Sequence, residues 1–321
     1  MQNSLPGFPS LKLRLKNQLK IASFIIVGSG ALLASSNASS HGHEKARSEL
    51  GFTTAKVSDH VYMLSGVGGF TGGNIGLSIG EDGVAMIDNG LSSVLDLLKA
   101  EIAKTTDKPI DYLINTHVHG DHIGNNESFG SDGTNVISHR NLRTSLVEKG
   151  VSIGGGKTKP APKHYLPVLT FSDQMTVHIN GDSAQIQHFA AAHTDGDAIV
   201  LFKNANVIHT GDIMFNELFP YIDSSNGGSF KGVLAALKSI HEMANDETLI
   251  IPGHGKLATK TDVKRTIEML EGVYQAVKAL HDKGMSDDDI LASKPLEPYS
   301  AYAWDFITAD IMTKQVLTAL K

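Results

Sequence analysis

Cysteine is absent from this sequence of 321 residues. The chain therefore carries no disulfide, no thiolate metal ligand and no cysteine to which a lipid could be attached. Any metal that the protein holds must bind nitrogen and oxygen atoms. Fifteen histidines and 34 aspartates and glutamates could supply these atoms, so the positions of these residues become the main question.

The N-terminal apolar run, residues 21–34, is too short to span a membrane. It has 14 residues, fewer than the roughly 20 that cross a bilayer. Four basic residues precede it between positions 12 and 20, and Ser36-Asn-Ala38 follows it. This order predicts a secretory signal peptide over residues 1–38, with an uncleaved membrane anchor as the alternative. We therefore expect a periplasmic or secreted protein that has no membrane contact after cleavage.

Positive charge is scarce in the mature chain. Residues 1–38 contain four basic and no acidic residues, so their removal leaves 24 basic against 34 acidic residues, a net charge of −10. We do not expect a nucleic-acid partner for such an acidic chain. We expect a small-molecule substrate. Oligomeric state is not predicted.

Short apolar segments at strand spacing predict an α/β protein with one domain over residues 52–321, preceded by a flexible tail at 39–51. Strands are expected at 54–57, 61–64, 74–79, 84–87, 112–114, 175–179, 184–188, 198–202, 207–210 and 249–251. Helical spacing is found at 91–102, 230–243, 263–280 and 304–320. The core of the domain is expected to end at 260, with a C-terminal helical extension at 261–321. Residues 150–167, rich in Gly, Lys and Pro, predict a long exposed loop.

A cluster of histidines follows the strand predicted at 112–114. The segment reads Thr116-His-Val-His-Gly-Asp-His122. His117 and His119 are two residues apart, so in extended backbone they lie on one side and can bind one metal. A turn after them can bring Asp121 and His122 to a second metal. Such a combination is a strong metal-site motif.

This motif resembles that of the metallo-β-lactamase superfamily, His-x-His-x-Asp-His after a strand. Three further family motifs occur in order, in Ala192-His-Thr194, Thr210-Gly-Asp212 and Pro252-Gly-His-Gly255, each at or just past the end of a predicted strand. The resemblance covers about residues 52–260. It implies a four-layer αβ/βα sandwich, with the C-terminal helices as an addition.

The resemblance also implies how the ligands divide between two metals. The first metal would bind His117, His119 and His193, and the second would bind Asp121, His122 and His254. Asp212 would bridge the two metals, and Asp88 would support the ligand loop without binding metal.

Histidine and carboxylate ligands favour zinc, two ions per chain, with iron or manganese as alternatives. Two metals roughly 3.5–4 Å apart share a water, lower its pKa to about 7 and so supply hydroxide at neutral pH. Asp121 would act as the catalytic carboxylate that orients this nucleophile and carries its proton.

A hydrolase that cleaves an amide, lactone, ester or thioester is the expected activity, with β-lactam hydrolysis among the candidates. A bridging aspartate is similar to the pattern of glyoxalase II and the lactonases, whereas export favours substrates outside the cytosol. Two alternatives stay open. One is an iron-dependent oxidoreductase or sulfur dioxygenase of the same fold, and the other is a non-catalytic metal-binding protein.

Four residues are candidates for substrate contact: Phe70, Asn216, Tyr221 and Ser229. Phe70 lies in a glycine-rich loop that resembles the substrate-covering loop of β-lactamases of this fold, and the other three follow Asp212. The histidines outside the motifs are assigned to structure or surface, namely His60, His139, His164, His178, His188, His209, His241 and His281.

Overall fold

The computed structural model describes residues 49–152 and 157–321. The predicted signal peptide and almost all of the predicted tail lie outside the described residues. One compact unit comprises Arg47–Lys321. No helix among the described residues is both long and apolar enough to cross a membrane.

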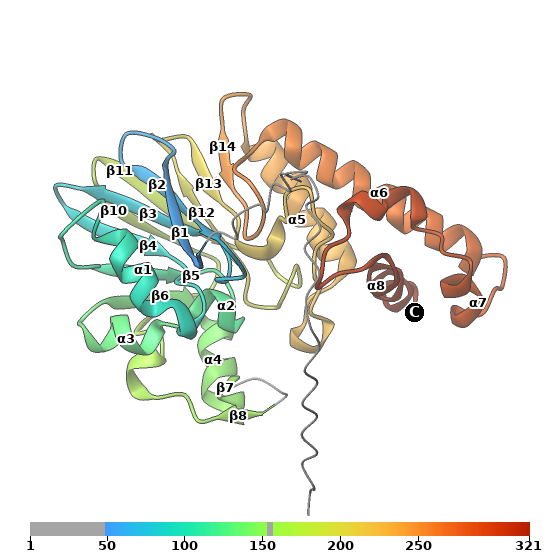
Figure 1. Ribbon diagram of the computed structural model, residues 1–321, viewed down its shortest axis with the longest axis horizontal. Coiled ribbons are helices and arrows are strands. Elements are labelled where there is room, and N and C mark those ends of the chain that lie inside the picture. Colours follow the sequence, from blue (N-terminus) through green and yellow to red (C-terminus); the bar gives the residue numbers. More distant parts are fainter. Residues whose placement is uncertain (1–48, 153–156) are drawn as a thin grey trace, which may run out of the picture. The chain divides into compact units, whose positions relative to one another are not determined.

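Two large mixed sheets form the centre of this unit (Figure 1). The first has the order β1-β2-β3-β4-β5-β6-β9 and the second β10-β11-β12-β13-β14-β15. The strands of the first sheet are β1 (Gly51–Lys56), β2 (Val61–Val67), β3 (Ile75–Gly80), β4 (Gly83–Ile87), β5 (Tyr112–Asn115), β6 (Asn135–His139) and β9 (Leu169–Phe171). Those of the second are β10 (Gln174–Ile179), β11 (Asp182–His188), β12 (Ala198–Phe202), β13 (Val207–His209), β14 (Leu249–Ile251) and β15 (Ala258–Thr259).

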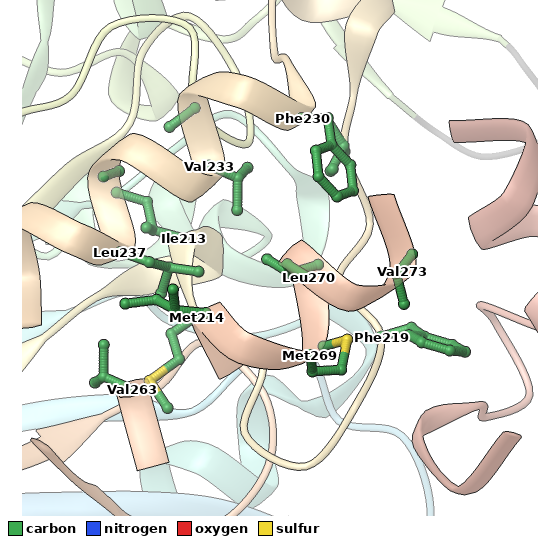
Figure 2. Packing of buried hydrophobic residues seen from close by; sticks show 14 of the residues in the cluster. Ile213, Met214, Phe219, Phe230, Val233, Leu237, Val263, Met269, Leu270 and Val273 are labelled. Atoms are coloured by element: carbon green, nitrogen blue, oxygen red, sulfur yellow. The ribbon is translucent and has the colours of Figure 1, made fainter. Parts of the chain in front are cut away.

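Helices pack on the outer faces of both sheets and on one another. They are α1 (Leu95–Ile102), α2 (Gly120–Ile123), α3 (Asn126–Ser131), α4 (Arg140–Lys149), α5 (Phe230–Met243), α6 (Lys260–His281), α7 (Asp287–Ala292) and α8 (Ala309–Leu320). Apolar residues of α5 and α6 pack together on the second sheet, among them Val233, Leu237, Val263 and Leu270 (Figure 2). α7 and α8 join the same apolar cluster, so the predicted C-terminal helices are present.

Alternation along the strands produces the four layers. In β5, Leu113 packs with α1 on the outer face, whereas Ile114 lies in the core between the sheets. In β12, Ile199 lies in the cluster with α5 and α6, whereas Val200 lies between the sheets. Because neighbouring side chains on a strand point to opposite faces, the central strands are buried on both sides, whereas the edge strands β1 and β10 keep one largely exposed face. The predicted αβ/βα sandwich is confirmed.

The strands that precede the candidate ligands are neighbours in these sheets. β4 pairs in parallel with β5, and β13 pairs in parallel with β14. Parallel neighbours end at the same edge of a sheet, so the loops that follow them meet. This arrangement brings the ligand motifs together although more than 130 residues separate the first from the last.

The segment 150–167 differs from the predicted exposed loop. It contains a short hairpin, β7 (Val151–Ser152) and β8 (Thr158–Lys159), and Val151 and Tyr165 are buried. Both pack with Leu142 and Leu146 of α4. The prediction weighed glycine, lysine and proline and overlooked these two apolar anchors. β6 and α4 were not expected either, and β1 begins at Gly51, inside the predicted tail.

Candidate metal centre

The loop after β5 presents four of the candidate ligands. His119 has extended backbone, with φ −72° and ψ 143°, and α2 begins directly after it. The backbone N–H groups of His122 and Ile123 both donate to the carbonyl of His119. This tight turn places Asp121 and His122 beside the pair His117 and His119, as the spacing predicted.

The first group of ligand atoms comes from His117, His119, His193 and Asp212, whose atoms lie within 4.8 Å of one another. His193 Nε2 lies 2.9 Å from His119 Nδ1. Asp212 Oδ2 lies 3.6 Å from His117 Nε2 and 3.5 Å from His193 Nε2. Atoms that carry lone pairs thus converge on one point, as the ligands of a tetrahedral ion do.

The second group comes from Asp121, His122 and His254, again within 4.8 Å. Asp121 Oδ2 lies 3.3 Å from His254 Nε2 and 3.6 Å from His122 Nε2. An isolated β-bridge between Phe215 and His254 fixes the loop that carries the last histidine. All six non-bridging residues of the prediction are therefore divided between the groups as the resemblance implied.

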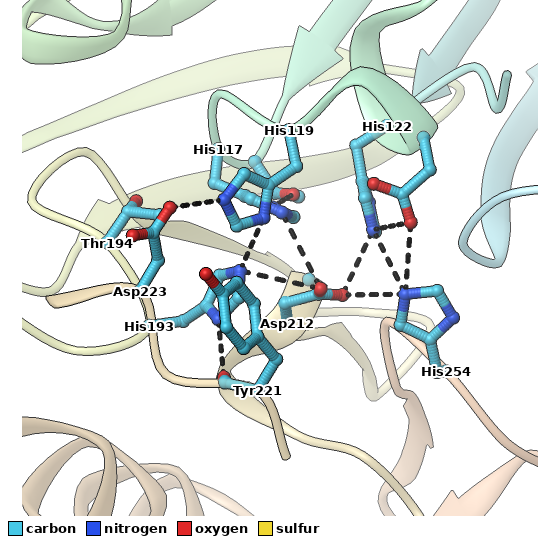
Figure 3. A network of polar contacts seen from close by, with 12 residues as sticks. His117, His119, His122, His193, Thr194, Asp212, Tyr221, Asp223 and His254 are labelled. Carbon is cyan, nitrogen blue, oxygen red and sulfur yellow. Dashed lines mark hydrogen bonds and ion pairs between the residues drawn. The ribbon is translucent and has the colours of Figure 1, made fainter. Parts of the chain in front are cut away.

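Asp212 lies between the two groups (Figure 3). Its Oδ2 is the atom near His117 and His193, whereas its Oδ1 lies 3.0 Å from His122 Nε2 and 3.4 Å from His254 Nε2. Each oxygen of one carboxylate therefore faces a different group. This is the arrangement that a bridging ligand requires.

The nitrogen that faces away from the centre is hydrogen-bonded in each of four histidines. His122 Nδ1 donates to Asp88 Oδ2 at 2.7 Å, and His193 Nδ1 donates to the carbonyl of Tyr221 at 2.8 Å. His119 Nε2 donates to Asp223 Oδ2 at 2.8 Å. His117 Nδ1 lies 3.0 Å from the Thr116 hydroxyl, which itself donates to Asp88. Such partners fix the tautomer and leave the opposite nitrogen free to bind a metal.

Asp88 makes hydrogen bonds with the loop that carries the candidate ligands. It is fully buried, and its carboxylate accepts hydrogen bonds from the backbone N–H and the hydroxyl of Thr116 as well as from His122. It also lies near His117. Because both of its oxygens are already engaged by donors, we interpret Asp88 as an acceptor for the histidines and not as a ligand.

Burial sets the protonation of the first group. Desolvation holds the pKa of His117 well below its usual range and lowers the pKa of His193 to about 4, so both imidazoles are neutral. Burial alone would raise the pKa of Asp212, but the surrounding histidines, led by His122, hold it well below its usual range. Neutral imidazoles beside an ionised carboxylate are the forms that bind metals.

The second group has the opposite balance. Burial lowers the pKa of His254, yet Asp212 and Asp121 outweigh it and raise this pKa to about 9. The same two carboxylates raise the pKa of His122 against the effect of burial. The carboxylates thus create a potential that favours positive charge at this point, which a bound cation would also satisfy.

Two buried atoms fit a metal better than they fit an empty protein interior. Among the described residues, His117 Nε2 and Asp212 Oδ1 are shielded from solvent and make no hydrogen bond of acceptable geometry, although Asp212 Oδ1 lies 3.0 Å from His122 Nε2. Buried polar atoms are nearly always satisfied. Since both atoms face other candidate ligand atoms, coordination of a metal explains them, and the residues present fit a two-metal group.

The candidate substrate contacts divide into two kinds. Phe70 stacks over His254 at a ring-centroid distance of 5.8 Å, and the Tyr221 ring lies 5.8 Å from that of His119. Ser229 instead caps α5 by accepting from the backbone N–H of Gly232, and its hydroxyl donates to a carbonyl. The amide of Asn216 is buried and donates to the carbonyl of Lys256. These local hydrogen bonds argue against substrate contact by Ser229 and Asn216.

The family model of the metallo-β-lactamase superfamily matches residues 68–254, more than half of the chain. The chain belongs to this superfamily. Its similarity to known members is low in sequence and clear in fold. At the level of the superfamily, the protein is a metal-dependent hydrolase with a histidine and aspartate cluster able to bind metal ions.

Similar proteins include two kinds of hydrolase. The linear primary-alkylsulfatase of Pseudomonas sp. is 21% identical, and the match covers 68% of this chain and 49% of the relative, so the chain spans about half the length of that protein. A solved metallo-β-lactamase of Pontibacter korlensis has 16% identity and a TM-score of 0.57, over 68% of this chain and 99% of that one. A solved variant of a sec-alkyl sulfatase has 16% identity and a TM-score of 0.62, over 84% of this chain and 50% of that one.

Sequence reasoning missed Asp223 and Asp197. Asp197 is buried and accepts from the backbone N–H groups of His193 and Thr194, so it shapes the third-histidine loop. Its place four residues after His193 was a usable signal. Asp223 lies 104 residues from His119, its partner, and no short motif marks it.

Proposed function

We propose that the protein is a two-zinc hydrolase that cleaves an amide, lactone, ester or thioester. The observation that carries the proposal is the position of Asp212, whose two oxygens face two separate ligand groups. A shared carboxylate holds two ions at the short spacing that a common water needs. Oxygen and nitrogen ligands without any thiolate suit zinc, and iron or manganese is the alternative.

Two zinc ions bound there would activate a water molecule and polarise the scissile carbonyl group. The protein itself orients the reactants. The side chains of His119 and Asp121 are about one-fifth exposed, whereas those of His117, His122 and Asp212 are almost fully buried. Substrate therefore approaches from the side of His119 and Asp121.

Asp121 is suited to handle the proton. Its Oδ2 faces His254 and His122, and the carboxylate stands at the open side of the centre, where an attacking water arrives. Desolvation would raise its pKa, but the adjacent His122 and His254 keep it below its usual value, so Asp121 is ionised and can accept a proton. In this proposal Asp121 Oδ2 or its partner oxygen takes the proton of the water and passes it to the leaving group.

A panel assay tests this proposal. The zinc-loaded protein is given β-lactams, homoserine lactones, thioesters and simple esters, and kcat/KM is compared between classes. We expect turnover in at least one acyl class, and we expect Asp121→Asn to reduce it by about 10²–10⁴-fold, the usual contribution of a general base. A protein with two bound zinc ions and no acyl turnover would refute the proposal.

Sulfate-ester hydrolysis is a second candidate. The solved sec-alkyl sulfatase covers 84% of this chain, more than the 68% that the β-lactamase covers. The fold of the sulfatase therefore matches a larger part of this chain than the fold of the β-lactamase does. Alkyl sulfates belong in the same panel, and turnover of these alone would favour this candidate over acyl hydrolysis.

We further propose that the protein acts in the periplasm or outside the cell after removal of residues 1–38. The order of basic, apolar and small residues supports this. N-terminal sequencing of exported protein should begin near Ser39. A mature chain that still begins at Met1 would refute the proposed cleavage.

A further inference from the structure

Aromatic rings run without interruption from the metal ligands to the C-terminal segment. The Tyr221 ring lies 5.8 Å from His119 and 5.7 Å from Phe306. Phe306 lies 5.7 Å from Trp304, which returns to the centre at 6.1 Å from His254. This row, Tyr221, Phe306 and Trp304, therefore touches a ligand of the first group at one end and a ligand of the second group at the other.

Phe70 adds a further aromatic ring beside His254. Its ring stacks on His254 with an interplanar angle of 17°, at 5.8 Å between centroids. His254 thus has an aromatic neighbour from the N-terminal glycine-rich loop and another from the segment between α7 and α8. Two parts of the chain more than 230 residues apart therefore contribute aromatic rings to the surroundings of His254.

The C-terminal wall is held in a fixed position. The indole N–H of Trp304 donates to the carbonyl of Phe219 at 2.9 Å, and the backbone N–H of Phe219 donates to Tyr302 at 2.7 Å. The backbone N–H of Trp304 donates to Ile307, which is itself buried. Because these bonds lie on both sides of Trp304, the ring is oriented before any ligand arrives.

The edges of the opening are exposed although they are apolar. Phe70 is 55% exposed and Phe306 is 60% exposed. Single exposed apolar residues are ordinary, but these two are joined to His254, Phe70 directly and Phe306 through Trp304, and exposed apolar side chains around a site indicate a binding surface. The charged residue between the two C-terminal rings is Asp305, an exposed acid, which disfavours an anionic group at that end.

From this arrangement we infer that Phe70, Tyr221, Trp304 and Phe306 form an apolar subsite for a neutral hydrocarbon chain of the substrate. This rests on the proposed hydrolase function and narrows its substrate class. The reacting ester, lactone, thioester or amide group lies at the metal centre, and the alkyl or acyl chain extends from it between Phe70 and Phe306. Short or strongly charged substrates leave this surface uncovered.

A series of p-nitrophenyl esters, from acetate to decanoate, tests the inference with the zinc-loaded protein. Burial of each methylene should raise kcat/KM by about fourfold until the chain fills the subsite. Phe306→Ala should flatten this dependence. Val147→Ala is the matched control, because Val147 is also 60% exposed but lies on α4. Equal chain-length dependence in Phe306→Ala and the unmutated protein would overturn the inference.

A binding measurement separates this inference from the proposed function. Trp304 is the single tryptophan of the chain, so intrinsic fluorescence reports on the subsite directly and needs no turnover. Octanoate should change the emission of the zinc-loaded protein at concentrations at which acetate does not, and Phe306→Ala should weaken octanoate binding by about tenfold or more. Ester turnover without an octanoate response refutes the subsite alone. An octanoate response without turnover of any substrate refutes the proposed function alone.

Discussion

Loss of Asp223 should weaken the first metal position without touching a ligand. Asp223 is buried, and its Oδ2 accepts the Nε2 proton of His119 at 2.8 Å. Four other hydrogen bonds hold the carboxylate in place, from the backbone N–H and hydroxyl of Ser225 and from the backbone and side-chain amides of Asn226. This hydrogen bond keeps the proton on Nε2 and so leaves Nδ1 of His119 to face the metal position.

The expected magnitude follows from this geometry. Loss of an outer partner of a metal-binding histidine typically costs 10–100-fold in metal affinity. Asp223→Ala removes the acceptor and frees the ring, so we expect about 100-fold weaker binding at the first position. Asp223→Asn keeps the shape, but its amide nitrogen must face the donors of Ser225 or Asn226, or else the proton of His119. We expect the metal affinity of the first position to fall about tenfold in this variant.

Competition with a chromogenic zinc chelator measures both stepwise dissociation constants. Asp182→Asn is the control, because Asp182 is a buried carboxylate that also accepts backbone N–H groups but lies outside the centre. It should keep both zinc affinities. If Asp223→Ala binds both ions as tightly as the unmutated protein, His119 does not depend on Asp223 and its assignment as an Nδ1 ligand is wrong.

Three further predictions concern the bridge, the packing and the pH dependence. Asp212→Ala should weaken binding of the second metal and reduce turnover by several orders of magnitude, whereas Asp212→Cys should retain metal and lose most acyl hydrolysis. Metal analysis and kinetics measure both effects. Two tightly held ions and full activity in Asp212→Ala would contradict the bridging role. Gly73→Ala should displace the ring of His122, because the added Cβ would lie 2.2 Å from His122 Cε1, and the zinc content of this variant should fall. Gly120→Ala is the control: it has open space around its Cβ and should keep two zinc ions. Asp182→Asn should lower the free energy of unfolding by about 1–2 kcal/mol at pH 7. Burial raises the pKa of Asp182, but its backbone donors outweigh burial and lower this pKa. The stability is therefore present above the unfolded pKa of about 3.9 and is lost as pH falls through the lower folded pKa, so a difference in unfolding free energy that does not shrink with falling pH in denaturant titrations would show another cause.

The sequence predicted the parts of the fold and of the centre that depend on short-range spacing. Strands such as β4 and β12 are unbroken apolar runs, which parallel or central strands require. His117, His119, Asp121 and His122 lie within six residues, so one turn determines their relation. For these elements the local pattern and the tertiary structure favour the same conformation, which is why the pattern sufficed.

Prediction was incomplete where long-range packing decides the outcome. The hairpin of β7 and β8 forms on apolar anchors that α4 offers, and α4 itself was not expected. Ser229 caps α5, whose start at 230 agrees with the predicted helix, although the same residue was also a candidate for substrate contact. Polar residues after a ligand motif look alike in sequence whether they cap a helix or face a substrate, because both roles require the same hydroxyl or amide.

Ligand identity and ligand orientation therefore come from different levels of the structure. A short motif supplies histidines, but each imidazole has two nitrogens, and the partner of the far nitrogen decides which one faces the metal. That partner is Asp88 for His122, a carbonyl in the loop of Tyr221 for His193 and Asp223 for His119. The same loop also places the Tyr221 ring against Phe306 of the C-terminal segment. A change in this loop would consequently alter both the metal affinity and the apolar opening, so substrate preference and metal binding are expected to vary together in this chain.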